Sequence, residues 1–411
     1  MGAINSGDTA FLLISAALVM FMTPGLALFY GGMVRQKNVL GTIMQSFFAL
    51  ALVTVLWVLV GYTLAFGPDH FGLIGGLKWL GLNGVGQLPN PAYAATVPAL
   101  VFMAYQGMFA GITPALITGA FAERMKFSAF IVFTAVWVLV VYAPIAHWVW
   151  GVGGWIRTLG ALDFAGGTVV HISSGAAALA AVLVIGKRKG FAQEIMHPHN
   201  IPMTVTGAAI LWFGWFGFNA GSALTSGGLA GLAFATTHIS AAAACLGWVT
   251  AEWLKTGKPT TLGAASGAVA GLVAITPAAG FIGPLAALVL GFIAGAVCFY
   301  AVSLKWRFGY DDSLDVVGVH FVGGTLGALA TGVLAQKALN SAGANGLLFG
   351  NAALLGKQAV AVAACIIYSF VATTVILRVI DAVIGLRVSD ENENVGLDLS
   401  QHSEVGYVWH E

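Results

Sequence analysis

The feature that most constrains this chain is its series of long apolar runs. Crossing about 30 Å of hydrocarbon takes an α-helix roughly 20 residues. Eleven runs approach or exceed that length: 9-31, 39-66, 95-121, 127-151, 164-186, 201-222, 228-254, 259-279, 282-304, 316-336 and 358-386. Apolar residues make up 59% of the chain and charged residues 8%, against about 45–50% and 25% in soluble domains. We predict an all-α integral membrane protein with eleven transmembrane helices.

The composition also argues against several functions. The formal net charge is +1, which leaves no basic stripe for a nucleic acid. Cys245, Cys298 and Cys365 lie inside apolar runs without the spacing of a metal site, so we predict no metal and no cofactor. A nucleophile elbow and a phosphate-binding loop are missing, which disfavours an enzyme. The run after Asp8 is longer than a signal-peptide core and follows no basic residue, so we assign it to the first helix.

The basic residues give the chain an orientation. Loops after odd-numbered helices, together with the end of the last helix, hold thirteen of the seventeen Lys and Arg residues: Arg35, Lys37, Arg124, Lys126, Lys187, Arg188, Lys189, Lys255, Lys258, Lys305, Arg307, Arg378 and Arg387. Such loops face the cytoplasm. We therefore predict an outside N-terminus and an inside C-terminus.

A short internal echo indicates a repeat. VVHISSG at 169–175 and GVHFVGG at 318–324 agree at their second, third and last positions, and each lies on the fifth helix of a five-helix block. Because five is odd, the second block runs through the membrane in the opposite sense, as in many transporters. We predict a transmembrane domain, 1-386, with inverted repeats at about 9-186 and 201-336 and an extra helix at 358-386; residues 387-411 form a cytoplasmic regulatory tail.

Two histidines are the sharpest candidates for function. His171 and His320 occupy equivalent places in the two repeats, inside spans where ionisable side chains are rare and costly. Pseudo-symmetry would bring their imidazoles together near the midplane, where neutral rings can hydrogen-bond each other. The alternative is that each histidine bonds a neighbouring carbonyl. His238 has no such mate, and we interpret it as structural.

Two aspartates precede these histidines. Asp163 lies eight residues before His171, about 12 Å along a helix. Its carboxylate has two compatible roles: stabilising a cation's site at long range, or capping the helix. Asp315, five residues before His320, is its predicted repeat-related counterpart and ranks below it.

Aromatic side chains share helix faces. Tyr105 and Phe109 are four residues apart, and Trp215, Phe218 and Ser222 follow a 0, 3, 7 spacing. Such stripes form either packing surfaces or, because aromatic faces attract cations and a hydroxyl accepts hydrogen bonds, a site for a small cation. Trp150 belongs either to that site or to an interfacial aromatic belt.

Several stretches, in order, resemble the ammonium transporter family, which includes methylammonium permeases and Rhesus glycoproteins. They are TPGLALFYGGMVRQKN from Thr23, GALDFAGGTVVH from Gly160, GWFGFNAGSA from Gly214, GKPTTLGAASGAVAGLVAITPAAG from Gly257 and DVVGVH from Asp315. The resemblance covers nearly the whole chain and is closer to the bacterial ammonium transporters than to Rhesus proteins. It implies a cell inner (plasma) membrane protein.

The resemblance also implies roles for single residues. Phe109, Trp150 and Ser222 match an outer recruitment site for ammonium, supported by Asp163. Phe109 and Phe218 match stacked gating rings. The pore residues it implies are the twin histidines His171 and His320, with Tyr105 and Trp215 beside them.

Two positions depart from the family pattern, and partners follow from the resemblance alone. Tyr105 stands where many members have Phe, which bears on selectivity or rate. The tail reads HSE at 402–404 where HGE is common, which bears on regulation through the tail.

The family implies a homotrimer in the lipid bilayer with one pore per subunit, and a PII-type regulatory protein docking on the cytoplasmic face.

The chemistry expected of such a pore is conduction of ammonia. Moving an ammonium-sized ion into an apolar medium costs on the order of 20 kcal/mol, whereas deprotonating an ammonium group at pH 7 costs about 4 to 5 kcal/mol. We therefore predict capture of NH4+, deprotonation, and passage of NH3, with net electrogenic transport. The alternatives are a neutral ammonia gas channel and an ammonium sensor acting through a partner protein; methylammonium is a possible second substrate.

Overall fold

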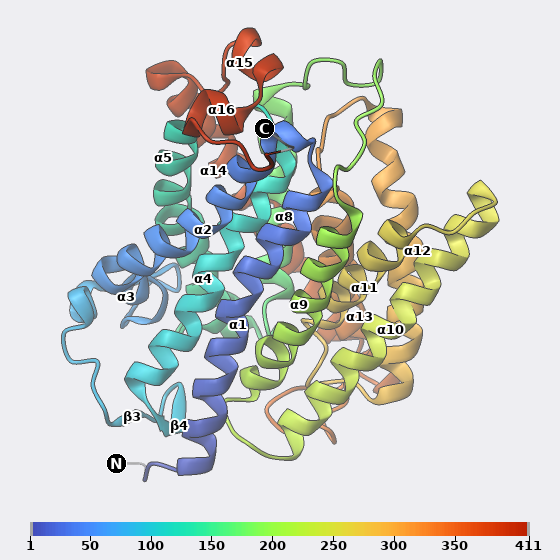
Figure 1. The fold of residues 1–411 in the computed structure, drawn as a ribbon. Helices are drawn as coiled ribbons and strands as arrows, with labels where there is room; N and C mark the ends of the chain where they lie inside the picture. The colour runs from blue at the N-terminus through green and yellow to red at the C-terminus, as the bar shows by residue number, and fades with distance from the viewer. Residues whose placement is uncertain (1–2, 409–411) are drawn as a thin grey trace.

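The computed structural model describes residues 3–408, which form a bundle of helices running between two opposite faces (Figure 1). The chain starts at one face, which we call the N-terminal face. Its last helices cover the opposite face, which we call the tail face. Among the described residues, ten helical segments are long and apolar enough to cross a membrane: Ser6–Met33, Gln36–Phe66, Ala99–Phe121, Phe127–Leu159, Gly167–Ile185, Ile201–Ala223, Gly228–Thr256, Pro284–Phe308, Val317–Leu334 and Ala352–Ile384. The predicted all-α class is confirmed, and these ten segments match ten of the predicted runs.

The remaining predicted run, 259-279, contains a shorter helix. α11 (Thr261–Ile275) has 15 residues, about 22 Å at 1.5 Å per residue. The side chain of Thr260 caps its start by accepting a hydrogen bond from Gly263 N, and Pro277, which has no N–H, stands just past its end. An odd number of crossings places the two ends of a chain on opposite faces, as Figure 1 shows here. The eleventh crossing stays a prediction.

The helical elements follow one another with short interruptions. In the first half they are α1 (Ser6–Met33), η1 (Gln36–Asn38), α2 (Val39–Leu56), η2 (Trp57–Gly61), α3 (Tyr62–Phe66), η3 (Leu77–Leu82), α4 (Ala99–Phe121), α5 (Phe127–Trp137), η4 (Val138–Tyr142), α6 (Ala143–Trp150), α7 (Trp155–Leu159), η5 (Gly167–Ile172) and α8 (Ser173–Ile185). In the second half they are α9 (Ile201–Ala220), η6 (Gly221–Ala223), α10 (Gly228–Thr256), α11, α12 (Pro284–Phe308), η7 (Val317–Phe321), α13 (Val322–Leu334), η8 (Leu347–Phe349), α14 (Ala352–Ile384), α15 (Asp390–Val395) and α16 (Leu397–His402).

Four of these elements are π-helical turns: η2 and η4 lie inside longer helices, and η5 and η7 form the start of theirs. Such wide turns are rare and frequent at functional sites. Two of them contain the predicted histidines, His171 in η5 and His320 in η7. Two small hairpins, β1 (Asp69–His70) with β2 (Ile74–Gly75) and β3 (Pro89–Asn90) with β4 (Ala94–Pro98), lie in the connection between α3 and α4.

Small residues let the helices approach closely. Membrane helices depend on such close packing because the hydrophobic effect does not drive them together in lipid. α9 lies along α1, and a Cβ added to Gly207 would lie 2.7 Å from the Cα of Phe29. On the other side of the bundle, a Cβ on Gly295 of α12 would lie 2.8 Å from the backbone nitrogen of Trp248 in α10. The high glycine content therefore serves close packing.

The tail is folded onto the tail face rather than extended. The carboxylate of Asp398 accepts hydrogen bonds from Leu40 N at 3.0 Å and Gly41 N at 2.8 Å, which caps the start of α2. The backbone N–H of Leu397 donates to Asn38 Oδ1 at 2.8 Å. The predicted tail, 387-411, therefore contains two short helices, and its last three residues, 409–411, lie outside the described part of the chain.

A buried ion-pair cluster joins the loops beneath this tail. Glu123 pairs with Arg35 at 2.8 Å and with Arg188 at 3.2 Å, and Arg188 also pairs with Asp311 at 2.8 Å. Burial favours the neutral acid, but the two guanidinium groups outweigh it and hold the pKa of Glu123 below its ordinary value. The cluster ties the ends of α1, α4 and α8 to the loop before η7.

Candidate functional site

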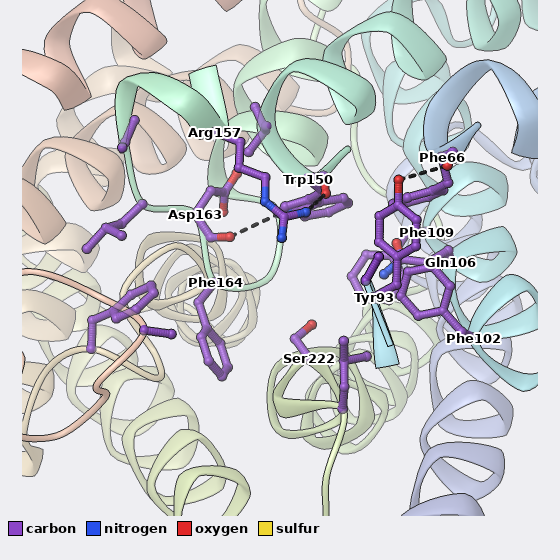
Figure 2. Close-up of a pocket in the computed structure, with 18 residues that line it drawn as sticks. Phe66, Tyr93, Phe102, Gln106, Phe109, Trp150, Arg157, Asp163, Phe164 and Ser222 are labelled. Atoms are coloured by element: carbon purple, nitrogen blue, oxygen red, sulfur yellow. Dashed lines mark hydrogen bonds between the residues drawn. The ribbon is translucent and has the colours of Figure 1, made fainter. Parts of the chain in front are cut away.

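A pocket of about 320 Å³ at the N-terminal end of the bundle brings four of the predicted residues together. Phe109 comes from α4, Trp150 from the last turn of α6, Asp163 from the loop before η5, and Ser222 from η6. Figure 2 shows Asp163 and Trp150 on one side of the pocket, Phe109 on the other, and Ser222 on a separate helix end between them. Residues spaced over more than 100 positions therefore line one cavity.

The carboxylate of Asp163 is held by backbone N–H groups. Its Oδ1 accepts from Gly166 and Gly167, both at 2.8 Å, and its Oδ2 accepts from Thr168 at 2.8 Å and Val169 at 3.2 Å. Burial raises the pKa of Asp163, and these four donors oppose that rise. Asp163 caps η5, so its charge can act on a cation in the pocket through space while its oxygens stay bonded to the backbone.

Trp150 is fixed by two hydrogen bonds. Its Nε1–H donates to the carbonyl oxygen of Asp163 at 3.0 Å, and its own carbonyl accepts from Arg157 Nη1 at 2.6 Å. Its ring lies 6.0 Å from the Phe109 ring at 90°. The indole edge and face are thereby set before any ligand arrives.

Two phenylalanine rings separate the pocket from the interior. The centroids of Phe109 and Phe218 are 4.2 Å apart, the rings are inclined by 32°, and both side chains are about 1% exposed. Phe109 lines the pocket at the N-terminal face, and Phe218 lines a smaller cavity deeper in the bundle. A molecule passing from one cavity to the other has to displace these rings.

Tyr105 lies beside these two phenylalanine rings. Its hydroxyl contacts the carbonyl oxygens of Gly217 and Phe218, each at 2.9 Å, and Ser222 Oγ at 3.2 Å. Its ring lies 5.0 Å from that of Phe109, and it lines neither cavity. Its extra hydroxyl therefore ties α4 to the end of α9.

The smaller cavity contains the two histidines. It measures about 10 Å³ and is lined by His171, His320, Trp215, Phe218 and seven aliphatic residues together with Phe29. A cavity of this size is close to the space that one water molecule needs, about 10–15 Å³. The ring of His171 stacks on Trp215 at 5.4 Å and 21°. The interior path is narrow, apolar and sized for one small molecule.

The imidazoles of His171 and His320 meet as the sequence predicts, with their Nδ1 atoms 3.2 Å apart. One Nδ1 donates and the other accepts, so a neutral pair holds a single proton between these two atoms. The ring that donates from Nδ1 leaves its Nε2 as an acceptor, and the other ring carries its proton on Nε2. The pair thereby offers the cavity one donor and one acceptor nitrogen. These tautomers are assigned from the hydrogen bond between the two rings.

Comparisons with known proteins identify the family of this chain. The model of the Ammonium Transporter Family matches residues 10–407. The chain belongs to the ammonium transporter family. An ammonium transporter of Bacillus subtilis is 56% identical over 403 residues, covering 98% of both chains. The crystal structure of Saccharomyces cerevisiae Mep2 superposes with a TM-score of 0.88 at 35% identity, covering 94% of this chain and 91% of that one. The solved structure of a sensor Amt protein has a TM-score of 0.89 at 29% identity, covering 96% and 98%.

Membership of the ammonium transporter family and the ten long apolar helices make the chain a multi-pass membrane protein. His238, for which we predicted no partner, lies on the exposed side of α10, where its ring is 5.4 Å from that of Trp212. It lines neither the pocket nor the small cavity.

The structure corrects the predicted counterpart of Asp163. Asp315 does not hold the place that Asp163 holds, because its carboxylate pairs with Lys305 Nζ at 2.5 Å. Asp312 holds that place instead: its Oδ2 accepts from Val317 N, the first residue of η7, at 2.7 Å. The signal was present in the sequence, since Asp312 precedes its histidine by eight residues, as Asp163 does.

Among the pocket residues that sequence reasoning missed, Gln106 has the clearest chemistry. Gln106, three residues before Phe109, lines the pocket, and its buried Oε1 has no hydrogen-bond partner among the described residues. An unpaired acceptor at the wall of a pocket is a ready ligand for an N–H donor. The helical spacing of Gln106 and Phe109 was available in the sequence, but an amide in an apolar run carries no charge that would single it out.

Proposed function

We propose that this ammonium transporter recruits NH4+ in the pocket at the N-terminal face. Aromatic faces of Phe109 and Trp150 attract the cation, the Ser222 hydroxyl accepts a hydrogen bond, and the carboxylate of Asp163 adds a favourable field. The observation that carries the proposal is their convergence on one pocket closed below by two stacked rings.

Deprotonation at the ring gate is the step that makes passage feasible. A cation in a medium of low dielectric meets a barrier on the order of 20 kcal/mol, whereas loss of the proton at pH 7 costs about 4 to 5 kcal/mol. The small cavity matches one neutral molecule, and Trp215 and the two histidines offer it an apolar wall with a donor and an acceptor. Potassium has no proton to lose, so the same path excludes it.

We propose further that transport is electrogenic, with the proton travelling separately past His171 and His320. The test is the charge displaced when ammonium, then potassium, is applied to proteoliposomes of the wild type and of His171→Ala with His320→Ala. We expect a sustained current for ammonium alone, which the double variant loses or extends to potassium. Absence of current for either ion, with intact ammonia uptake, supports the neutral gas channel instead.

A sensor role is the second candidate, favoured by one observation: the chain shares its fold with a sensor Amt protein. A sensor would bind ammonium and report it to a partner while transporting little. Uptake of radiolabelled methylammonium into proteoliposomes separates the two, because a transporter accumulates the label at a rate that Phe218→Trp, which enlarges a gate ring, reduces. Saturable binding without uptake supports the sensor.

The proposed assembly follows the family. We infer a homotrimer in the plasma membrane, with eleven crossings and the N-terminal face outside. Two inverted repeats are supported by Asp163 and Asp312, which cap corresponding π-helical turns eight residues before the paired histidines. A PII-type protein is the proposed regulator of the tail face. Its failure to bind the purified protein, with and without nucleotides, would count against that regulation.

A further inference from the structure

Asp312 stands just before η7, in the place that Asp163 occupies before η5. Both aspartates precede a pore histidine by eight residues, and both accept hydrogen bonds from the first turn of the π-helical segment that carries it. The side chain of Asp312 is buried, with 1% of the residue exposed. A buried carboxyl group therefore lies at the start of the helical segment that carries His320.

The two aspartates differ in how their oxygens are used. Both oxygens of Asp163 accept two backbone N–H groups each. Asp312 uses Oδ2 for Val317 N, whereas its buried Oδ1 has no hydrogen-bond partner among residues 3–408. An unpaired buried carboxylate oxygen is costly, and protonation relieves that cost. Asp312 thus has a free position for a proton, and Asp163 does not.

The charged and titratable groups around Asp312 come from three directions. Asp315 lies beside it in the chain, Lys305 faces it from α12, and the phenols of Tyr30 and Tyr310 lie within electrostatic range. The Lys305 ammonium donates to Asp315 Oδ1 at 2.5 Å and to the backbone oxygen of Asp312 at 3.1 Å, not to the Asp312 carboxylate. The carboxyl group of Asp312 is therefore not neutralised by an ion pair.

A cavity on the tail face reaches these neighbours. It measures about 440 Å³. Its lining includes Lys305, which donates a hydrogen bond to the backbone oxygen of Asp312, and Ser313, the next residue in the chain. Asp312 therefore lies next to two residues that line this cavity, although it does not line the cavity itself. This proximity gives a proton on the carboxyl group of Asp312 a compartment to which it can leave.

We propose that Asp312 is the proton acceptor at the tail-face end of the conduction path. In this step an O–H bond forms on Asp312 Oδ1 as the O–H or N–H bond of a donor in the pore, a hydronium or an imidazolium of the histidine pair, breaks. The proton then leaves to water or ammonia in the tail-face cavity, which restores the carboxylate and yields hydronium or ammonium. The inference rests on the proposed electrogenic function.

The electrostatic surroundings fit this role. Burial, and next the charge of Asp315, raise the pKa of Asp312 to about 7, although Lys305 and the backbone N–H groups of Val317 and Val316 oppose the rise. A group that takes up and releases protons near neutrality is suited to transfer in both directions. Acidification of the tail-face compartment through about pH 7 keeps Asp312 protonated, so it should reduce the current.

The test compares ammonium currents in proteoliposomes of the wild type, Asp312→Asn, Asp312→Glu and a control. Asparagine keeps an oxygen for Val317 N but cannot take the proton. The control is Asp381→Asn, an exposed aspartate of the same face that accepts a hydrogen bond from Leu386 N at 3.0 Å. Methylamine permeation and thermal unfolding report separately on the open pore and the fold.

We expect Asp312→Asn to lower the current about 100-fold, the scale that positioned proton-transfer groups contribute, with unfolding and methylamine permeation near wild type. Asp312→Glu should restore current with a displaced pH midpoint, and Asp315→Asn should move that midpoint to lower pH by removing a negative neighbour. Wild-type current in Asp312→Asn, with an unchanged pH profile, overturns this inference alone. A wild type without current overturns the electrogenic function and the inference together.

Discussion

Gly175 offers the most direct test of how packing sets the histidine pair. It is the third residue of α8, and a Cβ added there would lie 2.5 Å from the Cα and 2.6 Å from the Cβ of Phe321, the residue after His320. Ordinary contacts begin at 3.4 Å. Because the nearest atoms belong to the backbone, no rotamer change relieves the overlap. The nearest atom is the backbone nitrogen of Phe321 at 2.4 Å, so Gly175→Ala must separate α8 and η7 by up to about 1.0 Å.

That separation acts on the contact between the imidazoles. The Nδ1 atoms of His171 and His320 are 3.2 Å apart, so a shift of this size along their line takes them beyond hydrogen-bond range. Overpacking costs about 1–3 kcal/mol of stability, and losing one neutral hydrogen bond costs about 1 kcal/mol. If the lost hydrogen bond raises the free-energy barrier for conduction by this 1 kcal/mol, the ammonium flux falls about fivefold.

The measurement pairs ammonium current in proteoliposomes with thermal unfolding in detergent. Gly356→Ala in α14 is the matched control, because a Cβ there meets nothing within 4 Å. Alanine should leave its flux unchanged and its stability equal or slightly higher. Equal flux and equal unfolding temperature in Gly175→Ala and wild type would refute the claim that this glycine sets the distance between the histidines.

Two further predictions concern the tail face. The pKa of Glu123 is held below its ordinary value, so its ion pairs contribute stability that is complete above the unfolded value of about 4.5 and is lost as pH falls through the lower folded pKa. The unfolding temperatures of wild type and Glu123→Gln should therefore converge in acid. A constant difference between them down to pH 3 would contradict this. Ser403 ends α16 with φ 55°, a left-handed conformation that costs a side chain about 1–2 kcal/mol. Ser403→Gly should therefore tighten docking of the tail, measured as slower amide exchange over 397–402; unchanged exchange would show that the strain is relieved elsewhere.

The sequence alone determined the class of the protein and its central residues. Apolar length is a local property, so the spans could be read without knowing their neighbours. His171 and His320 stood out because ionisable groups inside a span are costly and need a partner, and the short echo around them placed that partner in the other repeat. The 3.2 Å contact between their rings confirms that placement.

The tertiary structure decided what spacing along one helix cannot. Asp315 was the nearer aspartate to the predicted span, but its positive φ of 64° turns the chain, and its carboxylate pairs with Lys305 while Asp312 caps η7. Tyr105 shared a helix face with Phe109, yet its hydroxyl binds the carbonyl of Gly217 on α9 and stays out of the path. Helical spacing fixes a direction from one axis, whereas a contact also depends on the position of the opposing helix, which only the packed bundle sets.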